Sequence, residues 1–199
     1  MRNDSLTRYI RASDFSPTVY NLREYIGGTI VHIQAIRQRR DLTIDHGDAI
    51  CSFRLPGDKD SKLPSLIPSL LRKTQPKESI KRSKEVRSAI DTLVKDNLGD
   101  RYADMIEITH LGTSPEKQGL GYGTALVKVV TDIADGQGLA VTLITTDAYR
   151  FYEFVGFELV AEKLVGVDNP TWDGAPVPIR LMLREPHRPG SWEKQMRHK

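Results

Sequence analysis

The sequence predicts a single α/β domain, and three observations lead to this fold class. The 199 residues, 39% hydrophobic and 28% charged, fit one compact domain and exclude collagen-like, coiled-coil and disordered chains. A strand, a glycine-rich loop, a helix and a second strand follow one another between residues 102 and 145. Two later segments, 157–167 and 177–183, predict an antiparallel pair of strands. A chain of this length buries about 70% of the surface that its unfolded form exposes, so a core forms without disulfides or metals.

Charge, cysteine content and hydropathy limit which partners and which cellular location we expect for this protein. The net charge of +3, from 29 basic and 26 acidic side chains, is too weak to favour nucleic acid as a partner. No stretch approaches the roughly 18 apolar residues of a membrane span, and residues 1–15 lack the apolar run of a signal sequence. Cys51, the single cysteine, cannot form an internal disulfide, and there is no Cys/His cluster. We therefore expect a cytoplasmic protein, monomeric or homodimeric, with no metal and no nucleic-acid or membrane partner.

The amino-terminal part predicts a short strand followed by two helices. Residues 6–11 have the pattern of a strand, and a cap at Ser13 and Asp14 precedes a helix over 15–25. The pair Gly27-Gly28 then interrupts the helical pattern. A second helix follows and ends in a basic run at residue 40.

A hairpin and a helical insertion come next. Residues 42–44 and 49–55 predict two strands joined by a tight turn. The insertion, 59–99, contains two amphipathic stretches, 63–71 and 83–98, and Gly99 ends the second of them. Its residues 72–87 hold seven Lys or Arg against two Glu, a pattern that is typical of a solvated helix face.

The carboxyl-terminal half predicts the remaining elements. The strand over 102–113 is expected to place Ile106, Ile108 and His110 on one face, and Glu107, Thr109 and Leu111 on the other. After the glycine loop come a helix that ends at 136–138, a buried strand over 139–145 and a short helix over 148–155. The domain is expected to span residues 1–185, with a flexible basic tail at 186–199.

The loop between the first of these strands and its helix predicts an anion site. Its residues are Gln118, Gly119, Leu120, Gly121, Tyr122, Gly123 and Thr124. The first amide groups of a helix have no internal partner and carry the positive end of its dipole. Glycines let an anion approach these donors, and three of them in five residues exceed the needs of a tight turn without a ligand.

The spacing of these glycines helps to choose between two anions. A dinucleotide fingerprint needs G-x-G-x-x-G, and its third position here is Thr124. Asp147 lies well beyond the interval of about 20 residues expected for a ribose-binding carboxylate. A nicotinamide-dependent oxidoreductase is therefore the weaker alternative to a site for the pyrophosphate of coenzyme A.

Two motifs resemble those of a known family. Gln118-x-x-Gly121-x-Gly123, followed by a helix, a strand and Phe151-Tyr152-Glu153-x-x-Gly156-Phe157, resembles the core motifs of the GNAT superfamily of acyl-CoA-dependent N-acetyltransferases. Residues 111–123 are similar to its puromycin acetyltransferase-like and fungal small-molecule branch. The match in motifs covers 102–160. Outside this range the resemblance is one of element order alone. Residues 6–15 correspond to the family's opening strand and the start of its first helix, and residues 42–55 correspond to its hairpin.

The resemblance implies an α/β GNAT fold. This fold is a mixed, curved sheet with flanking helices, and two neighbouring parallel strands, here 102–113 and 139–145, splay apart. Backbone amides of Gln118, Gly119, Leu120, Gly121, Tyr122, Gly123 and Thr124 would then bind the pyrophosphate of acetyl-CoA. The strand edge at Leu111, Gly112 and Thr113 would pair with the pantetheine amides, and the loop needs no metal. Thr145 stands where many members place an Asn that contacts the coenzyme.

The resemblance also implies the reaction, which is transfer of an acetyl group from acetyl-CoA to a primary amine by direct attack in a ternary complex. Tyr152 occupies the family's general-acid position, and a phenol with a pKa of about 10 is protonated at neutral pH. An aromatic core residue between Phe151 and Phe157 is the structural alternative. Glu107 aligns with a base of histone-type members, acting directly or through water, and His110 is its rival.

The acceptor carries no recognisable motif. We expect a small-molecule amine, while a peptide or protein amine stays open, and a catalytically silent acyl-CoA-binding protein is a further alternative. The resemblance implies that residues 15–40 and 59–99 form the acceptor pocket. The basic insertion, 59–99, mildly favours an acidic or phosphate-bearing partner, and the 3′-phosphate of the coenzyme is an alternative candidate for that partner.

Overall fold

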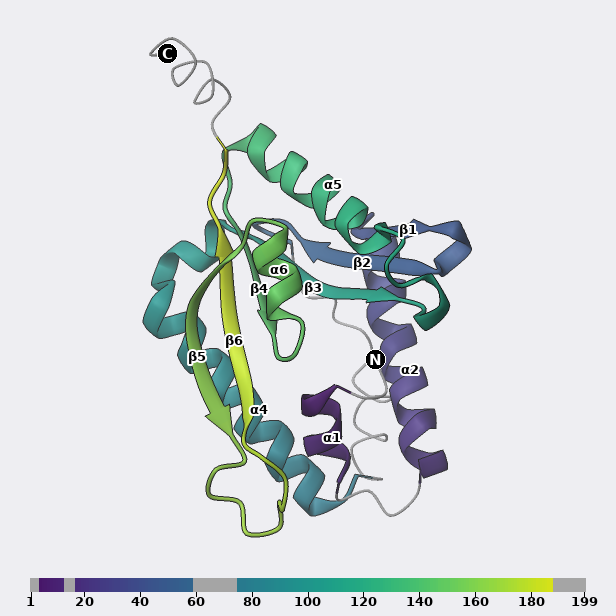
Figure 1. Cartoon of the computed structure of the whole chain (residues 1–199), viewed down its shortest axis with the longest axis vertical. Helices are drawn as coiled ribbons and strands as arrows, with labels where there is room; N and C mark the ends of the chain where they lie inside the picture. Colours follow the sequence, from purple (N-terminus) through teal and green to yellow (C-terminus); the bar gives the residue numbers. More distant parts are fainter. Residues whose placement is uncertain (1–3, 13–16, 59–74, 188–199) are drawn as a thin grey trace.

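A mixed sheet forms the centre of the molecule (Figure 1). The computed structural model describes residues 4–12, 17–58 and 75–187, and within them six strands pair in the order β1-β2-β3-β4-β6-β5. The strands are β1 (Asp41–Ile44), β2 (Ala49–Arg54), β3 (Ile106–Thr113), β4 (Val141–Thr145), β5 (Glu158–Val165) and β6 (Val177–Arg184). The helices are α1 (Ser5–Arg11), α2 (Pro17–Arg37), α4 (Lys77–Asn97), α5 (Tyr122–Gln137) and α6 (Tyr149–Phe154). The predicted α/β class with a mixed sheet is confirmed.

The parallel strands β3 and β4 part at the centre of the sheet. They pair at only three positions, the last of which joins Ile108 to Leu143. Beyond this point β3 continues to Thr113 and stays paired with β2 alone. The described strands therefore leave one edge of β3 unpaired from residue 109 onward, as predicted for splayed strands.

Helices cover both faces of the sheet. α5 and α6 pack on one face, where Leu126, Val127 and Val130 join Ile106 and Ile108 in a buried core. On the other face, α1 and α4 pack over β5 and β6 around Tyr9, Val86, Ala89, Ile179 and Leu181. No helix in the described residues combines the length and apolarity needed to cross a bilayer.

The segment predicted as an opening strand is the helix α1. Asp4 caps it, because its carboxylate accepts hydrogen bonds from the backbone N–H and the hydroxyl of Thr7. Tyr9 is fully buried against the edge of Trp172, at a ring-centroid distance of 5.2 Å. The Asp4 cap and the burial of Tyr9 thus stabilise a helix where a strand was predicted, and the apolar residues Leu6, Tyr9 and Ile10 have helical spacing. The described sheet begins at β1.

α2 is one helix, so the predicted interruption at Gly27-Gly28 was wrong. Glycine lowers helix stability without ending a helix, and neither residue has a positive φ. The predicted hairpin is confirmed as β1 and β2, which join through a 3-10 turn at Asp45–Gly47.

Replacing Gly28 with alanine should raise the free energy of unfolding by about 1 kcal/mol, because alanine has less backbone entropy to lose in a helix. A methyl group there meets no described atom within 4 Å. Urea unfolding measures the change. Gly57→Ala is the matched control and should destabilise, since Gly57 has a φ of +79°. A loss of stability in Gly28→Ala would show that the helix is strained there.

The basic run before residue 87 is not simply a solvated face. α4 begins at Lys77, earlier than predicted, and contains Arg82, which is only 1% exposed. Its guanidinium donates to the backbone carbonyls of Tyr9 and Thr171, each at 2.7 Å. Arg82 therefore joins α1 and the segment before β6 to α4.

Parts of the predicted insertion and tail lie outside the described residues. This holds for the amphipathic stretch 63–71 and for the tail from 188 onward. At the carboxyl end, the backbone N–H of His187 donates to Asp135 of α5, so the chain contacts the domain beyond residue 185.

Candidate active site

The glycine loop presents the open amino terminus of α5. Gly119 and Gly121 have φ angles of +81° and +82°, a region that favours glycine, and Gly121 is the N-cap residue. The first amides of α5 have no intrahelical partner, as at every helix start, and no side chain of the described residues caps this end. The loop therefore offers hydrogen-bond donors at the positive end of a helix dipole.

A cavity of ≈850 Å³ lies against this loop and the end of β3. Its lining includes every predicted coenzyme-binding residue except Leu120, which is 59% exposed. These residues are Leu111, Gly112, Thr113, Gln118, Gly119, Gly121, Tyr122, Gly123 and Thr124. The structure brings together two predicted segments that lie on different elements.

The same cavity includes residues that the sequence did not single out. They are Lys117, Ala125, Lys128, Ala148, Phe151 and Phe154. Lys128 lies nearly two turns into α5, so its spacing from the glycines would have been the signal for it. A Cβ atom on Gly123 would lie 3.4 Å from Phe151 Cζ, so glycine allows the close approach of α6.

Tyr122 joins this loop to the β1–β2 turn. Its hydroxyl donates to the Asp45 carboxylate, and this hydrogen bond raises the pKa of Tyr122. Lys117 approaches Asp48 in the same turn, with Nζ and Oδ2 3.5 Å apart. These two contacts hold the glycine loop against the β1–β2 turn.

Tyr152 lies on α6 and belongs to the core. It is 7% exposed, with ring centroids 5.2 Å from Phe151 and 5.8 Å from Phe157. Among the described residues no hydrogen-bond partner is found for its hydroxyl. Burial, and to a lesser extent Cys51, raises the pKa of Tyr152 well above its usual value. The phenol therefore stays protonated. Phe151 lines the cavity beside the glycine loop, whereas Tyr152 is not among the described residues that line it.

Glu107 is held by an ion pair on β3. Its Oε2 accepts hydrogen bonds from Arg54, one of them at 2.9 Å from Nε. The hydroxyl of Tyr102 lies 3.3 Å from Arg54 Nη2. Arg54 was missed at the level of sequence, because its partner comes from a strand 53 residues later.

A bulge changes which side chains share a face of β3. The register shifts between Ser52 and Phe53, so that Phe53 opposes Ile108 while Ser52 opposes His110. Leu111 consequently packs toward the α5 core, with Ile106 and Ile108. The predicted faces for His110 and Leu111 were wrong.

His110 instead lies on the opposite face, beside α2. Its ring packs edge-on against His32 at 5.2 Å, and His32 Nδ1 is 3.1 Å from Asp41 Oδ2. Burial is the largest cause that lowers the pKa of His110, and His32 adds to it, while Asp41 opposes them. A lowered pKa favours a neutral imidazole at neutral pH, which is the form that accepts a proton.

A second cavity, which we call the splay cavity, lies where β3 and β4 part. Its volume is ≈410 Å³. The lining residues are Ile10, Ser83, Val86, Arg87, Ile90, Glu107, Ile108, Thr109 and Ile144. Glu107 thus lines the splay cavity, whereas His110 does not. The cavity is mostly aliphatic and lies between α4 and the two strands.

Two observations count against a dinucleotide site. The Asp147 carboxylate accepts hydrogen bonds from the backbone N–H and the hydroxyl of Ser5, at 2.7 and 2.6 Å, so it is engaged in holding α1. The single parallel strand pair of the described sheet differs from the repeated parallel units of a dinucleotide-binding fold. Within the described residues, no group of three His, Cys, Asp or Glu side chains is placed to hold a metal ion.

Comparison with known proteins gives a consistent result. Residues 92–157 match the acetyltransferase (GNAT) family. An uncharacterized N-acetyltransferase from Schizosaccharomyces pombe is 28% identical over 112 residues, which cover 51% of this chain and 43% of that protein. This chain thus spans less than half the length of that relative. Arylalkylamine N-acetyltransferase 2 from Aedes aegypti shares the fold, with a TM-score of 0.57, 14% identity and coverage of 94% and 88% of the two chains.

Proposed function

We propose that this chain, whose residues 92–157 match the GNAT family of acetyltransferases, transfers the acetyl group of acetyl-CoA to a primary amine. One observation carries the proposal. The open amino terminus of α5, with its positive-φ glycines, lines the same cavity as the end of β3, where that strand has lost its partner β4. An anion site and a free strand edge therefore lie side by side, as an acyl-CoA requires.

The coenzyme binds through two kinds of backbone contact. Its diphosphate accepts hydrogen bonds from amides of residues 118–124. Lys117 and Lys128 line the same cavity, each paired with a carboxylate, so the backbone amides are the main anion-binding groups. The pantetheine amides pair with the free edge at Leu111, Gly112 and Thr113, in the manner of an added strand. The thioester then reaches the point where β3 and β4 part.

Transfer requires a proton acceptor for the amine and a proton donor for the thiolate. The neutral amine nitrogen forms a bond to the thioester carbon, the carbon–sulfur bond breaks, and Tyr152 protonates the sulfur. Glu107 accepts the amine proton, directly or through water, because it lines the splay cavity. His110 is the second candidate, since it lies on the same face of the sheet.

Replacing Glu107 with glutamine should lower kcat by about 100-fold, since removal of a general base costs at least that much. His110→Gln should change kcat less than threefold, as expected for a residue outside the splay cavity. Steady-state kinetics of both variants, with CoA affinity as the check on folding, decide the assignment. The reverse pattern would make His110 the base.

The proposed function is tested by CoA thiol release with acetyl-CoA and a panel of amines, amino acids, polyamines, aminoglycosides and basic peptides. We expect release with at least one small-molecule amine. A silent acyl-CoA-binding protein would bind the coenzyme and release no thiol. An oxidoreductase would be thermally protected by NAD(P) and not by acetyl-CoA.

We further infer a cytoplasmic enzyme that acts as a monomer or homodimer on small molecules. The inference on location rests on Cys51, a free and fully buried thiol in a chain with no second cysteine. Burial raises the pKa of this thiol to about 12, so it is a poor acyl carrier and direct attack is the simpler route.

A further inference from the structure

We propose that Arg87 recognises a carboxylate on the acceptor, so that the substrate class is amines that also carry a carboxylate. The inference rests on the proposed function and adds the chemistry of its second substrate. Arg87 belongs to the basic run whose composition favours an acidic or phosphate-bearing partner, and it does not line the cavity proposed for the coenzyme.

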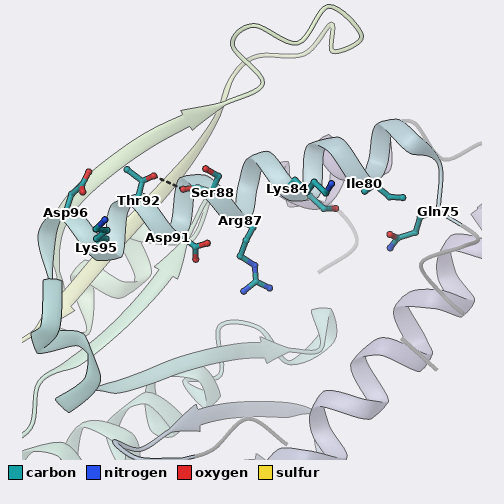
Figure 2. Close-up of a pocket in the computed structure, with 10 residues that line it drawn as sticks. Gln75, Ile80, Lys84, Arg87, Ser88, Asp91, Thr92, Lys95 and Asp96 are labelled. Atoms are coloured by element: carbon teal, nitrogen blue, oxygen red, sulfur yellow. Dashed lines mark hydrogen bonds between the residues drawn. The ribbon is translucent and has the colours of Figure 1, made fainter. Parts of the chain in front are cut away.

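Arg87 lies at the junction of three hollows on one side of α4. It lines the splay cavity of ≈410 Å³ and a neighbouring cavity of ≈370 Å³ that extends to Gly99. It also lines a groove of ≈630 Å³ along the exposed side of α4, where Figure 2 shows its side chain extended away from the helix axis. Glu107 lines the first two of these hollows as well, so the guanidinium and the carboxylate face shared space.

The cations near this space differ in what they already bind. Arg82 donates to backbone carbonyls in the interior, and Arg54 is paired with Glu107. Within the described part of the chain, Arg87 forms no ion pair, including none with Asp91 one turn later. An exposed guanidinium with five N–H donors is thus available to a ligand.

The charge balance of the splay cavity favours an anion. Arg87 and Glu107 are the ionisable residues among its described lining, and Arg54 already compensates Glu107. Arg87 therefore leaves a net positive charge beside aliphatic side chains, where electrostatic attraction is stronger than in water. A guanidinium binds a carboxylate through two parallel hydrogen bonds, and a second ammonium there would be repelled.

The position of Arg87 also sets the direction of the acceptor. The amine points toward β3, where Glu107 lies and where the thioester arrives. The carboxylate points toward α4 and Arg87, while Val86, Ile90 and Ile144 surround the carbon chain between them. Lys84 and Lys95 in the adjoining groove are accompanied by Asp91 and Asp96, so their charges balance.

The experiment measures kcat/KM by thiol release for a series of ω-amino carboxylates, each beside the alkylamine and the diamine of equal chain length. We expect the wild-type enzyme to prefer the carboxylate at its best chain length by about tenfold or more. Arg87→Met should abolish this preference through KM, and Arg87→Lys should keep part of it. Arg87→Glu should shift the preference toward the diamine.

Lys81→Met is the matched control, because Lys81 is an exposed cation on the same helix that lines none of the three hollows. It should leave every preference unchanged. Equal or better use of diamines by the wild type, or an unchanged preference in Arg87→Met, would overturn the role of Arg87 while leaving acetyl transfer established. Coenzyme binding without thiol release from any amine would overturn the proposed function itself.

Discussion

Replacing Gly121 with alanine is expected to weaken CoA binding by at least tenfold, which corresponds to about 1.4 kcal/mol. The φ of +82° at this N-cap residue is one that alanine adopts only at a cost of about 1–2 kcal/mol. The loop will relax toward a negative φ, and the amides of the first turn of α5 will no longer converge on one point. The loss should appear in the Kd for CoA, measured by calorimetry.

Gly138 supplies the matched control at the other end of the same helix. It has a φ of +67°, and a Cβ there would meet no described atom within 4 Å. Gly138→Ala should therefore lower the free energy of unfolding about as much as Gly121→Ala does, with no change in CoA affinity. Equal losses of affinity in the two variants would mean that the effect comes from stability and not from the loop.

Removing only the hydroxyl of Tyr152, in Tyr152→Phe, is expected to lower kcat by about 100-fold with little change in CoA affinity. Phenylalanine keeps the ring contacts with Phe151 and Phe157, so the core should stay intact. Tyr149→Phe is the control on the same helix, where Arg180 lies 4.2 Å from the ring centroid. Unaltered turnover in Tyr152→Phe would leave this tyrosine as a core residue only.

The raised pKa of Tyr152 also fixes the sign of a pH effect. Its ordinary value is about 10, and burial moves it upward, so the protonated form persists at every pH below about 10. Tyr152 should therefore produce no fall in kcat between neutral pH and about pH 10. A fall in that interval that disappears in Tyr152→Phe would contradict the buried, protonated phenol.

Local rules predicted the carboxyl-terminal half well, because its turns depend on glycine. Gly121 and Gly138 delimit α5, and Gly156 with a φ of +92° follows α6, so each positive φ marks a boundary visible in the sequence. The residues proposed to bind the coenzyme could be selected from the sequence for the same reason, and all but Leu120 line one cavity. A loop that needs glycine at alternating positions has few structural alternatives.

Predictions failed where distant contacts or a small local irregularity decide the structure. Leu6 to Arg11 is too short a segment for periodicity to separate helix from strand, and the Asp4 cap and the burial of Tyr9 make it a helix. The bulge opposite Ser52 and Phe53 inserts one residue, Thr109, into β3 and exchanges the faces of the residues that follow it. No periodicity in one sequence reveals such an insertion.

The residues of the proposed acceptor pocket were not predicted from the sequence, for a related reason. Arg82 and Arg87 belong to one basic run, but one is buried and the other faces the splay cavity. Which of the two side chains is buried depends on which side of α4 packs against β5 and β6. Helical spacing shows which residues share one face of the helix, but it does not show what that face packs against.

The central claim is that amides of the glycine loop bind the diphosphate of the coenzyme, and amide NMR tests it most directly. Isotope-labelled protein is titrated with CoA and, separately, with pantetheine, which lacks the diphosphate. The amide resonances of Gly119, Gly121 and Gly123 are predicted to shift strongly with CoA and hardly at all with pantetheine. CoA binding that leaves these three resonances in place would contradict the account.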